Sequence, residues 1–272
     1  MNKSNVWANA VAYEAYVGRW SRLVAGEFLE WLAVPPGSRW LDVGCGTGAL
    51  TEAILRRAQP ESVTGVDPSE GFVAYAREHV QDSRASFREG DAMALPFDDE
   101  MFGAVVSGLV LNHIPRHDAA LAEMVRVGAW GAVVAAYVWD YAGQMQMLHV
   151  FWDAAVELDQ AAAEKDQRRL YPICKPDPLA EQFKSAGLTS VEVQALDVTT
   201  HFRDFDDYWS PFLGGQGPAP SYVMSLTEER RTVLRELIRS RLPAAPDGSI
   251  SLPARAWAVR GNRKPFPGSA SG

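Results

Sequence analysis

The stretch "LDVGCGTGAL" (41–50) places three glycines within five positions, directly behind a short apolar run. Glycine loses more backbone freedom on folding than any other residue, so such a run is costly unless the chain must turn sharply or approach a ligand closely. In open α/β sheets a glycine-rich turn between a buried strand and a helix is a nucleotide-binding arrangement. The stretch therefore predicts an α/β sheet that carries a ligand at this turn.

The segments around the turn alternate between apolar strands and helices. We expect strands at 39–43, 62–67, 85–90, 101–108 and 131–139, and helices at 49–58, 69–80 and 117–127. Strands that are almost wholly apolar and separated by helices form a parallel sheet covered on both faces. The predicted fold class is therefore α/β, a doubly wound and mostly parallel sheet.

The pattern changes after Trp139. We expect a long helix over 141–166, a short helix over 179–188, a strand of ten alternating residues over 189–198, an aromatic loop over 205–220, a charged helix over 227–242 and a last strand over 250–261. Pro253 in that last strand indicates a sheet edge or a bulge. One domain over 1–263 fits best, with parts that we assign as follows: capping helices over 1–34, a cofactor-binding core over 39–139, lid insertions over 140–176 and 203–248, and a disordered tail over 264–272.

Charge and composition narrow the partners. The 272 residues carry a net charge of −8 and no Lys/Arg cluster, which argues against a nucleic-acid partner. The longest apolar stretches are far shorter than the roughly 20 residues of a membrane span. No signal peptide is visible, and Cys45 and Cys174 lack metal-type spacing, so we expect no metal site and two reduced thiols in a cytoplasmic protein.

The glycine spacing separates the candidate ligands. An NTP-binding loop ends in Gly-Lys-Ser/Thr, whereas Gly48 is followed by Ala49. A dinucleotide fingerprint needs a third glycine at a wider spacing than Gly44-x-Gly46-x-Gly48. Asp42, two residues before the first glycine, is awkward for a pyrophosphate but suits a ligand that carries an ammonium and a sulfonium. A turn that binds nothing and only leads the strand into the helix is the alternative.

Two further acids follow the next two strands. Asp67 ends the strand 62–67, where a carboxylate can accept hydrogen bonds from both ribose hydroxyls. Its alternative role is the N-cap of the helix that begins at Ser69. Asp91 follows the third strand, where it can take an adenine amino group while Ala92 and Met93 line the apolar face of the ring.

At this point the chain resembles a known family. Residues 39–139 are similar to class I S-adenosylmethionine-dependent methyltransferases of the small-molecule group that includes the quinone-biosynthesis C-methyltransferases. The motifs that carry the resemblance are "WLDVGCGTGALT", "VTGVDPSEGFVAYAR", "FREGDAMALPFDDEMFGAVVSGLVLNHI" and "LAEMVRVGAWGAVVAAYVW". The resemblance implies a seven-stranded sheet in the order 3-2-1-4-5-7-6, with the last strand antiparallel, and S-adenosylmethionine as cofactor, with S-adenosylhomocysteine as product.

The same resemblance implies where the cofactor would be held. It points to contacts at Asp42, Gly44, Gly46, Asp67, Asp91 and Ala92. We add to that set the adjoining positions Cys45, Gly48, Pro68, Met93 and Ser107. One departure stands out, because the family commonly has Arg-Pro-Gly-Gly before the fifth strand and this chain has Ala-Trp-Gly-Ala over 129–132. We expect altered packing there rather than lost activity.

Two other segments carry candidate site residues. The stretch "YEAYVGRWSR" (13–22) resembles the segment that closes over the methionine end of the cofactor in this group. Arg19 is a candidate partner for the cofactor carboxylate, and Tyr13 or Tyr16 for the sulfonium; an amphipathic docking helix is the alternative. His113, just past the fourth strand, is a candidate general base, a wall of the pocket, or a cap of the next helix.

Aromatic residues recur in the lid segments. Trp139, Tyr141 and Trp209 are candidates for the acceptor pocket, although such residues most simply form the buried face of a helix. The expected function is methyl transfer to a small organic acceptor by in-line displacement. The alternatives are a Rossmann-type NAD oxidoreductase and a non-catalytic S-adenosylmethionine-binding protein, and the sequence leaves monomer and homodimer open.

Overall fold

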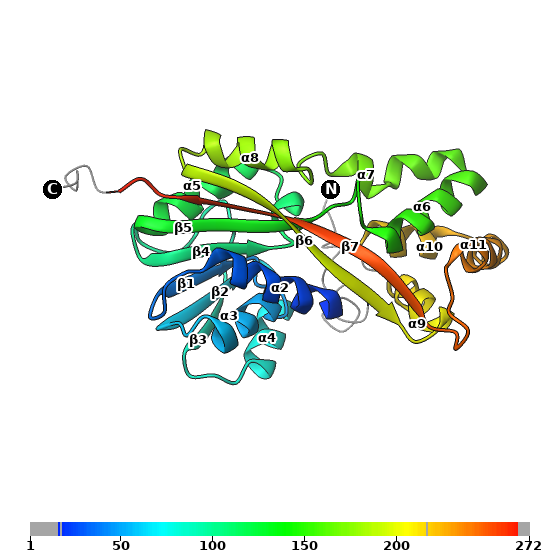
Figure 1. The fold of residues 1–272 in the computed structure, drawn as a ribbon, viewed down its shortest axis with the longest axis horizontal. Coiled ribbons are helices and arrows are strands. Elements are labelled where there is room, and N and C mark those ends of the chain that lie inside the picture. The colour runs from blue at the N-terminus through cyan, green and yellow to red at the C-terminus, as the bar shows by residue number, and fades with distance from the viewer. Residues whose placement is uncertain (1–15, 17, 216, 266–272) are drawn as a thin grey trace. The chain divides into compact units, whose positions relative to one another are not determined.

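One seven-stranded sheet organises the chain, with the strand order β3-β2-β1-β4-β5-β7-β6 and antiparallel pairing of β7, as the resemblance implied (Figure 1). The computed structural model describes residues 16, 18–215 and 217–265. The strands are β1 Arg39–Val43, β2 Ser62–Asp67, β3 Ala85–Glu89, β4 Phe102–Gly108, β5 Gly128–Trp139, β6 Thr189–Phe202 and β7 Ile250–Asn262. The expected strands are confirmed, and β6 continues four residues beyond the ten that alternate. Pro253 does not mark a sheet edge, because β7 lies between β5 and β6.

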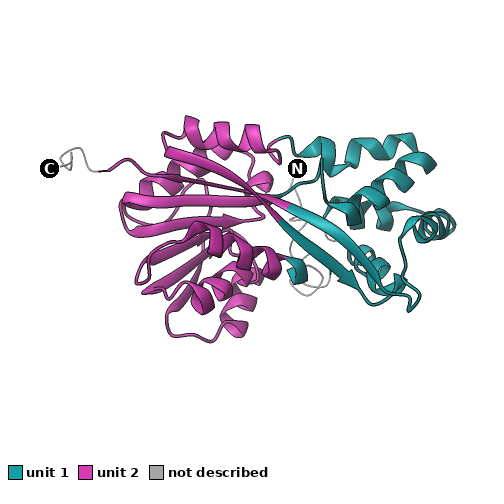
Figure 2. Cartoon of the chain, viewed as in Figure 1, with its two compact units in different colours: residues 1–20, 139–172, 197–255 teal, residues 21–138, 173–196, 256–272 magenta. Residues whose placement is uncertain are grey.

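The chain divides into two compact units, which Figure 2 colours separately. Unit 2 comprises residues 21–138, 173–196 and 256–272, and unit 1 comprises 1–20, 139–172 and 197–255. Strands β6 and β7 contribute residues to both units. No helix of the described residues is long and apolar enough to cross a bilayer.

In unit 2 the helices lie on both faces of the sheet, with α5 and α8 on one face and α2, α3 and α4 on the other (Figure 1). Their bounds are α2 Arg19–Leu32, which begins in unit 1, α3 Ala49–Arg57, α4 Glu70–His79, α5 His117–Val127 and α8 Pro176–Ser185. Leu41, Val105 and Val134 are fully buried in the sheet between these layers. Apolar burial of this kind, at about 25 cal/mol per Å², is the main term that holds a doubly wound sheet together.

The parallel register places the ends of neighbouring strands together. Strand β1 runs parallel to β2 on one side and to β4 on the other, so that Asp42 pairs with Gly65 and with Val106. Because β1 is followed by β2 in one direction and by β4 in the other, this is the point where strand order reverses. Ligands of open α/β sheets bind outside the carboxyl ends of the strands at such a point.

Unit 1 differs from the sequence expectation in two segments. The long helix expected over 141–166 is divided into α6 Gln146–Leu158 and the short helices η3 Gln160–Lys165 and α7 Gln167–Leu170. The division occurs at Asp159, which is extended and whose side chain accepts a hydrogen bond from the Ala161 amide at 3.0 Å. The Asp140 carboxylate likewise accepts from the Gly143 and Gln144 amides, which keeps this segment out of the helix.

The second difference is at 205–220, where the prediction of a loop is wrong. This segment folds into α9 Phe205–Trp209, η4 Ser210–Gly214 and the start of α10 Pro218–Ser225. Proline occupies the first turn of η4 and of α10, where its missing N–H costs nothing. The charged helix follows as expected, as α11 Glu228–Arg241, with Thr227 as its N-cap.

An aromatic cluster forms the centre of unit 1. The ring of Phe151 stacks on Phe212 with centroids 4.7 Å apart, and Phe212 also meets the edge of Tyr16 at 5.4 Å. Tyr208, fully buried, packs against the same ring and donates its hydroxyl to the Met147 carbonyl oxygen at 2.8 Å. We call the residues Tyr16, Phe151, Trp152, Tyr208, Phe212 and Tyr222 the aromatic cluster.

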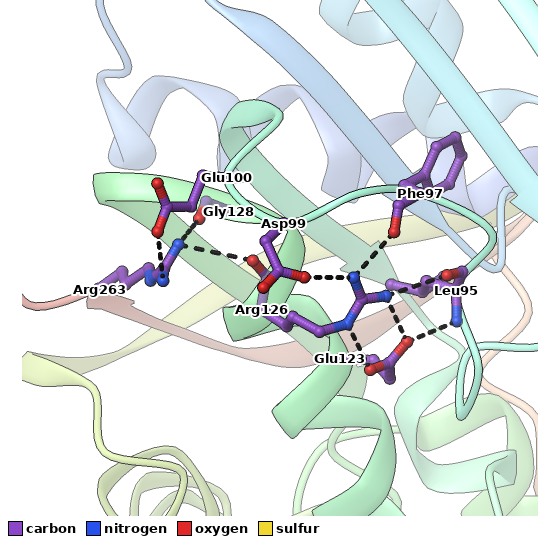
Figure 3. Close-up of polar contacts among 8 residues, drawn as sticks. All are labelled: Leu95, Phe97, Asp99, Glu100, Glu123, Arg126, Gly128 and Arg263. Carbon is purple, nitrogen blue, oxygen red and sulfur yellow. Dashed lines mark hydrogen bonds and ion pairs between the residues drawn. The ribbon is translucent and has the colours of Figure 1, made fainter.

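The altered turn before β5 has a local packing solution. The register between β4 and β5 shifts at residues 129–132. Phe102 pairs with Gly128, whereas Ala104, two residues later, pairs with Val133. Arg263 lies over the exposed Trp130 ring at 4.2 Å. Its guanidinium donates to the Gly128 carbonyl oxygen and to Glu100 (Figure 3). These contacts attach the residue that follows β7 to the start of β5.

Candidate cofactor-binding site

The glycine loop between β1 and α3 turns by means of backbone angles that favour glycine. Gly44, Gly46 and Gly48 all have positive φ, at +74°, +51° and +90°. A Cβ on Gly44 would lie 2.5 Å from a Val110 methyl carbon, whereas a Cβ on Gly46 would meet nothing within 4 Å. Gly44 is therefore required by close packing. Gly46 leaves open space beside the backbone, where a ligand can approach.

The Asp42 carboxylate is buried and only half satisfied. Asp42 is only 1% exposed to solvent. Its Oδ2 atom accepts a hydrogen bond from the Thr51 hydroxyl at 2.7 Å. Oδ1 is also buried and has no hydrogen-bond partner in the described chain. Burial raises the pKa of Asp42 to about 7, with the Thr51 hydrogen bond opposing that rise and the charge of Asp67 adding to it. An unpaired buried carboxylate oxygen is costly, so it points to a donor on a ligand.

The Asp67 carboxylate sits at the end of β2 and is fixed by two backbone amides. Oδ2 accepts from Gly46 N at 3.0 Å and Oδ1 accepts from Ser69 N at 2.9 Å. Burial raises the pKa of Asp67, and both hydrogen bonds act against that rise. Asp67 is not the cap of α4, because Ser69 is the N-cap and accepts from Phe72 N. Each carboxylate oxygen keeps a second lone pair for a ligand hydroxyl.

The loop after β3 presents Asp91 at the surface above the buried Ala92. The carboxylate of Asp91 accepts from Met93 N at 2.8 Å, which folds the loop back on itself, and Met93 is half-buried. A Cβ on Gly90 would lie 2.7 Å from a Val66 methyl carbon, so this loop lies close to the end of β2. The arrangement places a carboxylate beside small apolar side chains.

An arginine on α5 fixes the far end of the same loop (Figure 3). The Arg126 guanidinium donates to the carbonyl oxygens of Phe97 and Leu95 at 2.8 and 3.0 Å, and it pairs with Glu123 at 2.7 Å. Glu123 in turn accepts from Leu95 N at 2.7 Å. Sequence reasoning missed this anchor, because nothing near Arg126 in the chain indicates that it holds a loop about thirty residues earlier.

Strand β4 is followed by a strained residue and by a half-buried histidine. Ser107 has a buried hydroxyl without a hydrogen-bond partner in the described chain, and Leu109 has a φ of +62°. Such strain in a non-glycine residue often occurs at functional sites, and in the described chain it also occurs at Ala33, Gln59, Glu100 and Ser190. His113 closes the short helix η2 Leu111–His113, with Nε2 3.2 Å from the Asn112 amide nitrogen. Burial lowers the pKa of His113 to about 4, so its ring is neutral at physiological pH.

These positions decide some of the alternatives left by the sequence. His113 does not cap the next helix, because the N-cap of α5 is Arg116. Cys45 is a buried thiol that packs with Val73, Ala76 and Phe87, and burial raises its pKa, so its side chain contributes packing rather than reactivity. Pro68 is exposed beside Asp67. Neither Cys45 nor Cys174 forms a disulfide.

Other candidates lie in unit 1. Tyr13 lies outside the described residues. The Arg19 guanidinium pairs with the Asp207 carboxylate at 3.1 and 3.3 Å and lies over the rings of Trp20 and Phe202.

The aromatic candidates for the acceptor pocket are all buried. Trp139 ends β5, and its indole N–H has no hydrogen-bond partner in the described chain. Tyr141 contacts Tyr171 at 5.4 Å, and Trp209 stacks on Phe205 at 6.4 Å. Met147, Phe151 and Trp152 are the buried face of α6, as the simpler interpretation expected.

The fold and the loop together define a domain that binds an adenosine-containing cation rather than a dinucleotide. The residues present fit S-adenosylmethionine: an unpaired buried Asp42 oxygen suits its cationic end, and Asp67 and Asp91 suit its ribose and adenine. Comparisons with known proteins agree. Residues 41–136 match the methyltransferase domain family. A demethylmenaquinone methyltransferase from Roseiflexus castenholzii is 33% identical over 175 residues, which is 59% of this chain and 72% of that protein.

Solved structures share the fold at low identity. A methyltransferase from Bacillus halodurans superposes with a TM-score of 0.59 at 17% identity, covering 88% of this chain and 98% of that one. Phosphoethanolamine N-methyltransferase 2 from Haemonchus contortus, in complex with S-adenosyl-L-methionine, superposes with a TM-score of 0.57 at 19% identity, covering 94% of this chain and 57% of that one.

This chain belongs to the class I S-adenosylmethionine-dependent methyltransferases, and it is similar to the quinone-biosynthesis enzymes of that family. Its cofactor is S-adenosylmethionine, which excludes the NAD oxidoreductase considered from the sequence. Two other demethylmenaquinone methyltransferases match over only 44% and 47% of their own length, so the chain spans less than half of those relatives.

Proposed function

We propose that this protein transfers the methyl group of S-adenosylmethionine to a small, largely apolar acceptor that contains an aromatic or quinol ring. The observation that carries the proposal is the similarity to a demethylmenaquinone methyltransferase, at 33% identity over 72% of that protein. The demethylmenaquinone methyltransferase relative, whose name indicates a quinone-type acceptor, supports the same class.

The cofactor-contact residues keep the roles expected from the sequence. We propose that the glycine loop and Asp42 receive the methionine part of the cofactor, that Asp67 receives the ribose, and that Asp91 receives the adenine, with Ala92 and Met93 against the ring. Cys45, Pro68 and Ser107 complete the surroundings of these groups. Arg19 and Tyr13, from the N-terminal segment, remain candidates for the methionine end. Trp139, Tyr141 and Trp209 remain candidates for contact with the acceptor.

The proposed reaction asks little of the protein beyond placement. Bound S-adenosylmethionine supplies an electrophilic methyl carbon and a neutral thioether leaving group. The protein holds the two reactants in line and excludes water, and positioning of this kind is worth roughly 7–11 kcal/mol of barrier. A neutral His113 can accept a hydrogen bond or a proton, but its pKa of about 4 makes it a weak base at pH 7. We therefore propose that His113 contributes little to the rate of methyl transfer.

Release of S-adenosylhomocysteine across a panel of acceptors tests the proposal. The panel contains hydroquinones with and without a prenyl chain, simple phenols, primary amines and carboxylic acids. We expect turnover with ring-containing acceptors, rising with apolar size, and none with small charged amines. Asp67→Asn should abolish that turnover, whereas the same change at the exposed Asp82 should leave it intact. Turnover only with amines or carboxylates would refute the acceptor class, and tight cofactor binding without turnover would favour a non-catalytic role.

A further inference from the structure

The half-satisfied carboxylate of Asp42 has a consequence for how the cofactor binds. One oxygen is held by Thr51, which lies in the first turn of α3, and the other oxygen is buried with no partner in the described chain. The flanking strands offer no compensating charge, because Gly65 of β2 and Val106 of β4 are the residues that pair with Asp42.

The charge of Asp67, at the end of β2, discourages ionisation of Asp42. The Cys45 thiol in the glycine loop supplies no opposing charge, because burial and both carboxylates raise its pKa and keep it neutral. Glu52, the acid next to Thr51 on α3, instead pairs with Arg56 and Arg22 on the exposed face of that helix. Asp42 is therefore a buried carboxyl group next to a second carboxylate, Asp67, and burial raises the pKa of Asp42 to about 7.

We propose that Thr51 is a positioning residue that holds the Asp42 carboxyl group with its unpaired oxygen toward the cofactor, and that the cofactor's ammonium group drives a proton off Asp42 when it binds. The exchange is balanced. A protonated Asp42 loses its proton to solvent, the carboxylate forms an ion pair with the ammonium group, and no other bond forms or breaks. This inference concerns the cofactor alone and does not depend on the identity of the acceptor.

Thr51 controls what fraction of Asp42 is protonated before the cofactor binds. Its hydroxyl donates to the ionised carboxylate and so lowers the pKa of Asp42 against the effect of burial. Without that hydroxyl a larger fraction of Asp42 would be protonated at neutral pH, and the cofactor would have to displace more protons. A purely structural threonine would change stability but would leave the number of displaced protons unchanged.

Calorimetric titration in buffers of different ionisation enthalpy counts those protons directly. S-adenosylhomocysteine is the probe, because it keeps the ammonium group and lacks the sulfonium, and the range stays below pH 7.5, where α-ammonium groups remain mostly charged. We expect about 0.5 proton released per molecule bound at pH 7 and about 0.9 at pH 6, with affinity weakening about eightfold from pH 7.5 to pH 6. 5′-Methylthioadenosine, which lacks the amino-acid part, should release none.

The variants separate positioning from folding. Asp42→Asn should abolish proton release. Thr51→Val should raise it toward one proton at pH 7 and weaken binding, whereas Thr51→Ser should restore wild-type behaviour. Thr64→Val, which removes a hydroxyl that contacts only Ser86 in the described contacts, is the matched control and should change neither quantity. Unchanged affinity for 5′-methylthioadenosine shows that each variant keeps a folded nucleoside pocket.

Three results would overturn the inference. One is proton release by Asp42→Asn equal to that of the wild type. A second is equal release with 5′-methylthioadenosine, which would assign the proton to burial of the nucleoside rather than to the ammonium group. The third is a Thr51→Val variant that binds more weakly but displaces the same number of protons, which would reduce Thr51 to a structural role.

Discussion

Replacing Asp42 with asparagine should stabilise the ligand-free protein while it weakens cofactor binding. In the folded state the pKa of Asp42 is raised to about 7, against about 3.9 in an unfolded chain. The unfolded chain therefore loses this proton at lower pH than the folded one, and the stability of the folded state falls as pH rises from about 4 to 7. A difference of three pKa units corresponds to about 4 kcal/mol at pH 7.5.

Asparagine has nearly the same shape, carries no charge to bury, and keeps an oxygen that can accept from Thr51. Its gain is therefore bounded by about 4 kcal/mol at pH 7.5 and by less than half of that at pH 5. For a chain of this size each kcal/mol raises the melting temperature by roughly 2 °C. Differential scanning fluorimetry of wild type and variant at pH 5 to 8 measures the difference. A variant that melts below the wild type at pH 7.5, or a difference that does not grow with pH, would refute the reasoning.

Three other substitutions have definite expected outcomes. Gly44→Ala should weaken cofactor binding at least tenfold, because its Cβ would meet Val110 at 2.5 Å and its φ is +74°; the added change Val110→Ala should recover only part of the loss in a binding titration. His113→Gln should lower kcat less than about tenfold, because a base with a pKa of about 4 contributes little at pH 7; a hundredfold loss would contradict this. Arg126→Gln should raise the Kd for 5′-methylthioadenosine severalfold by releasing the loop that carries Asp91, and an unchanged Kd would show that the loop holds itself.

The sheet, and the placement of three acids near its strand ends, could be predicted from the sequence because both follow from local patterns. Apolar strands separated by helices imply parallel pairing, and parallel pairing brings the carboxyl ends of strands to one edge. Asp42, Asp67 and Asp91 each stand near the end of a strand, so their common placement follows without knowing any long-range contact. The register pairs Asp42 with Gly65 of β2 and with Val106 of β4.

The partners of these acids could not be predicted in the same way. Thr51 lies nine residues after Asp42 in the chain, and the contact depends on how α3 packs against the sheet. The Val110 side chain, which follows strand β4, leaves no room for a Cβ atom on Gly44. Arg126 holds a loop about thirty residues away in the chain. Such contacts depend on packing that no periodicity encodes.

The errors in unit 1 have local causes. The helical composition of 141–166 continues past Asp159, but an extended Asp159 that accepts from the Ala161 amide ends one helix and starts another. The proline and glycine content of 205–220 indicates a loop, yet Pro211 and Pro218 occupy first-turn positions where proline favours a helix. In the first segment a side-chain cap outweighs average composition, and in the second the first-turn prolines do.

The central claim is that this chain moves a methyl group from S-adenosylmethionine to a small ring-containing acceptor. Incubation with methyl-labelled S-adenosylmethionine and the hydroquinone panel, followed by quantification of label and of S-adenosylhomocysteine, tests it most directly. The account predicts one labelled methyl in the acceptor for each S-adenosylhomocysteine formed, and none with Asp67→Asn. Label recovered only in unreacted S-adenosylmethionine, or transferred only to acceptors without a ring, would contradict it.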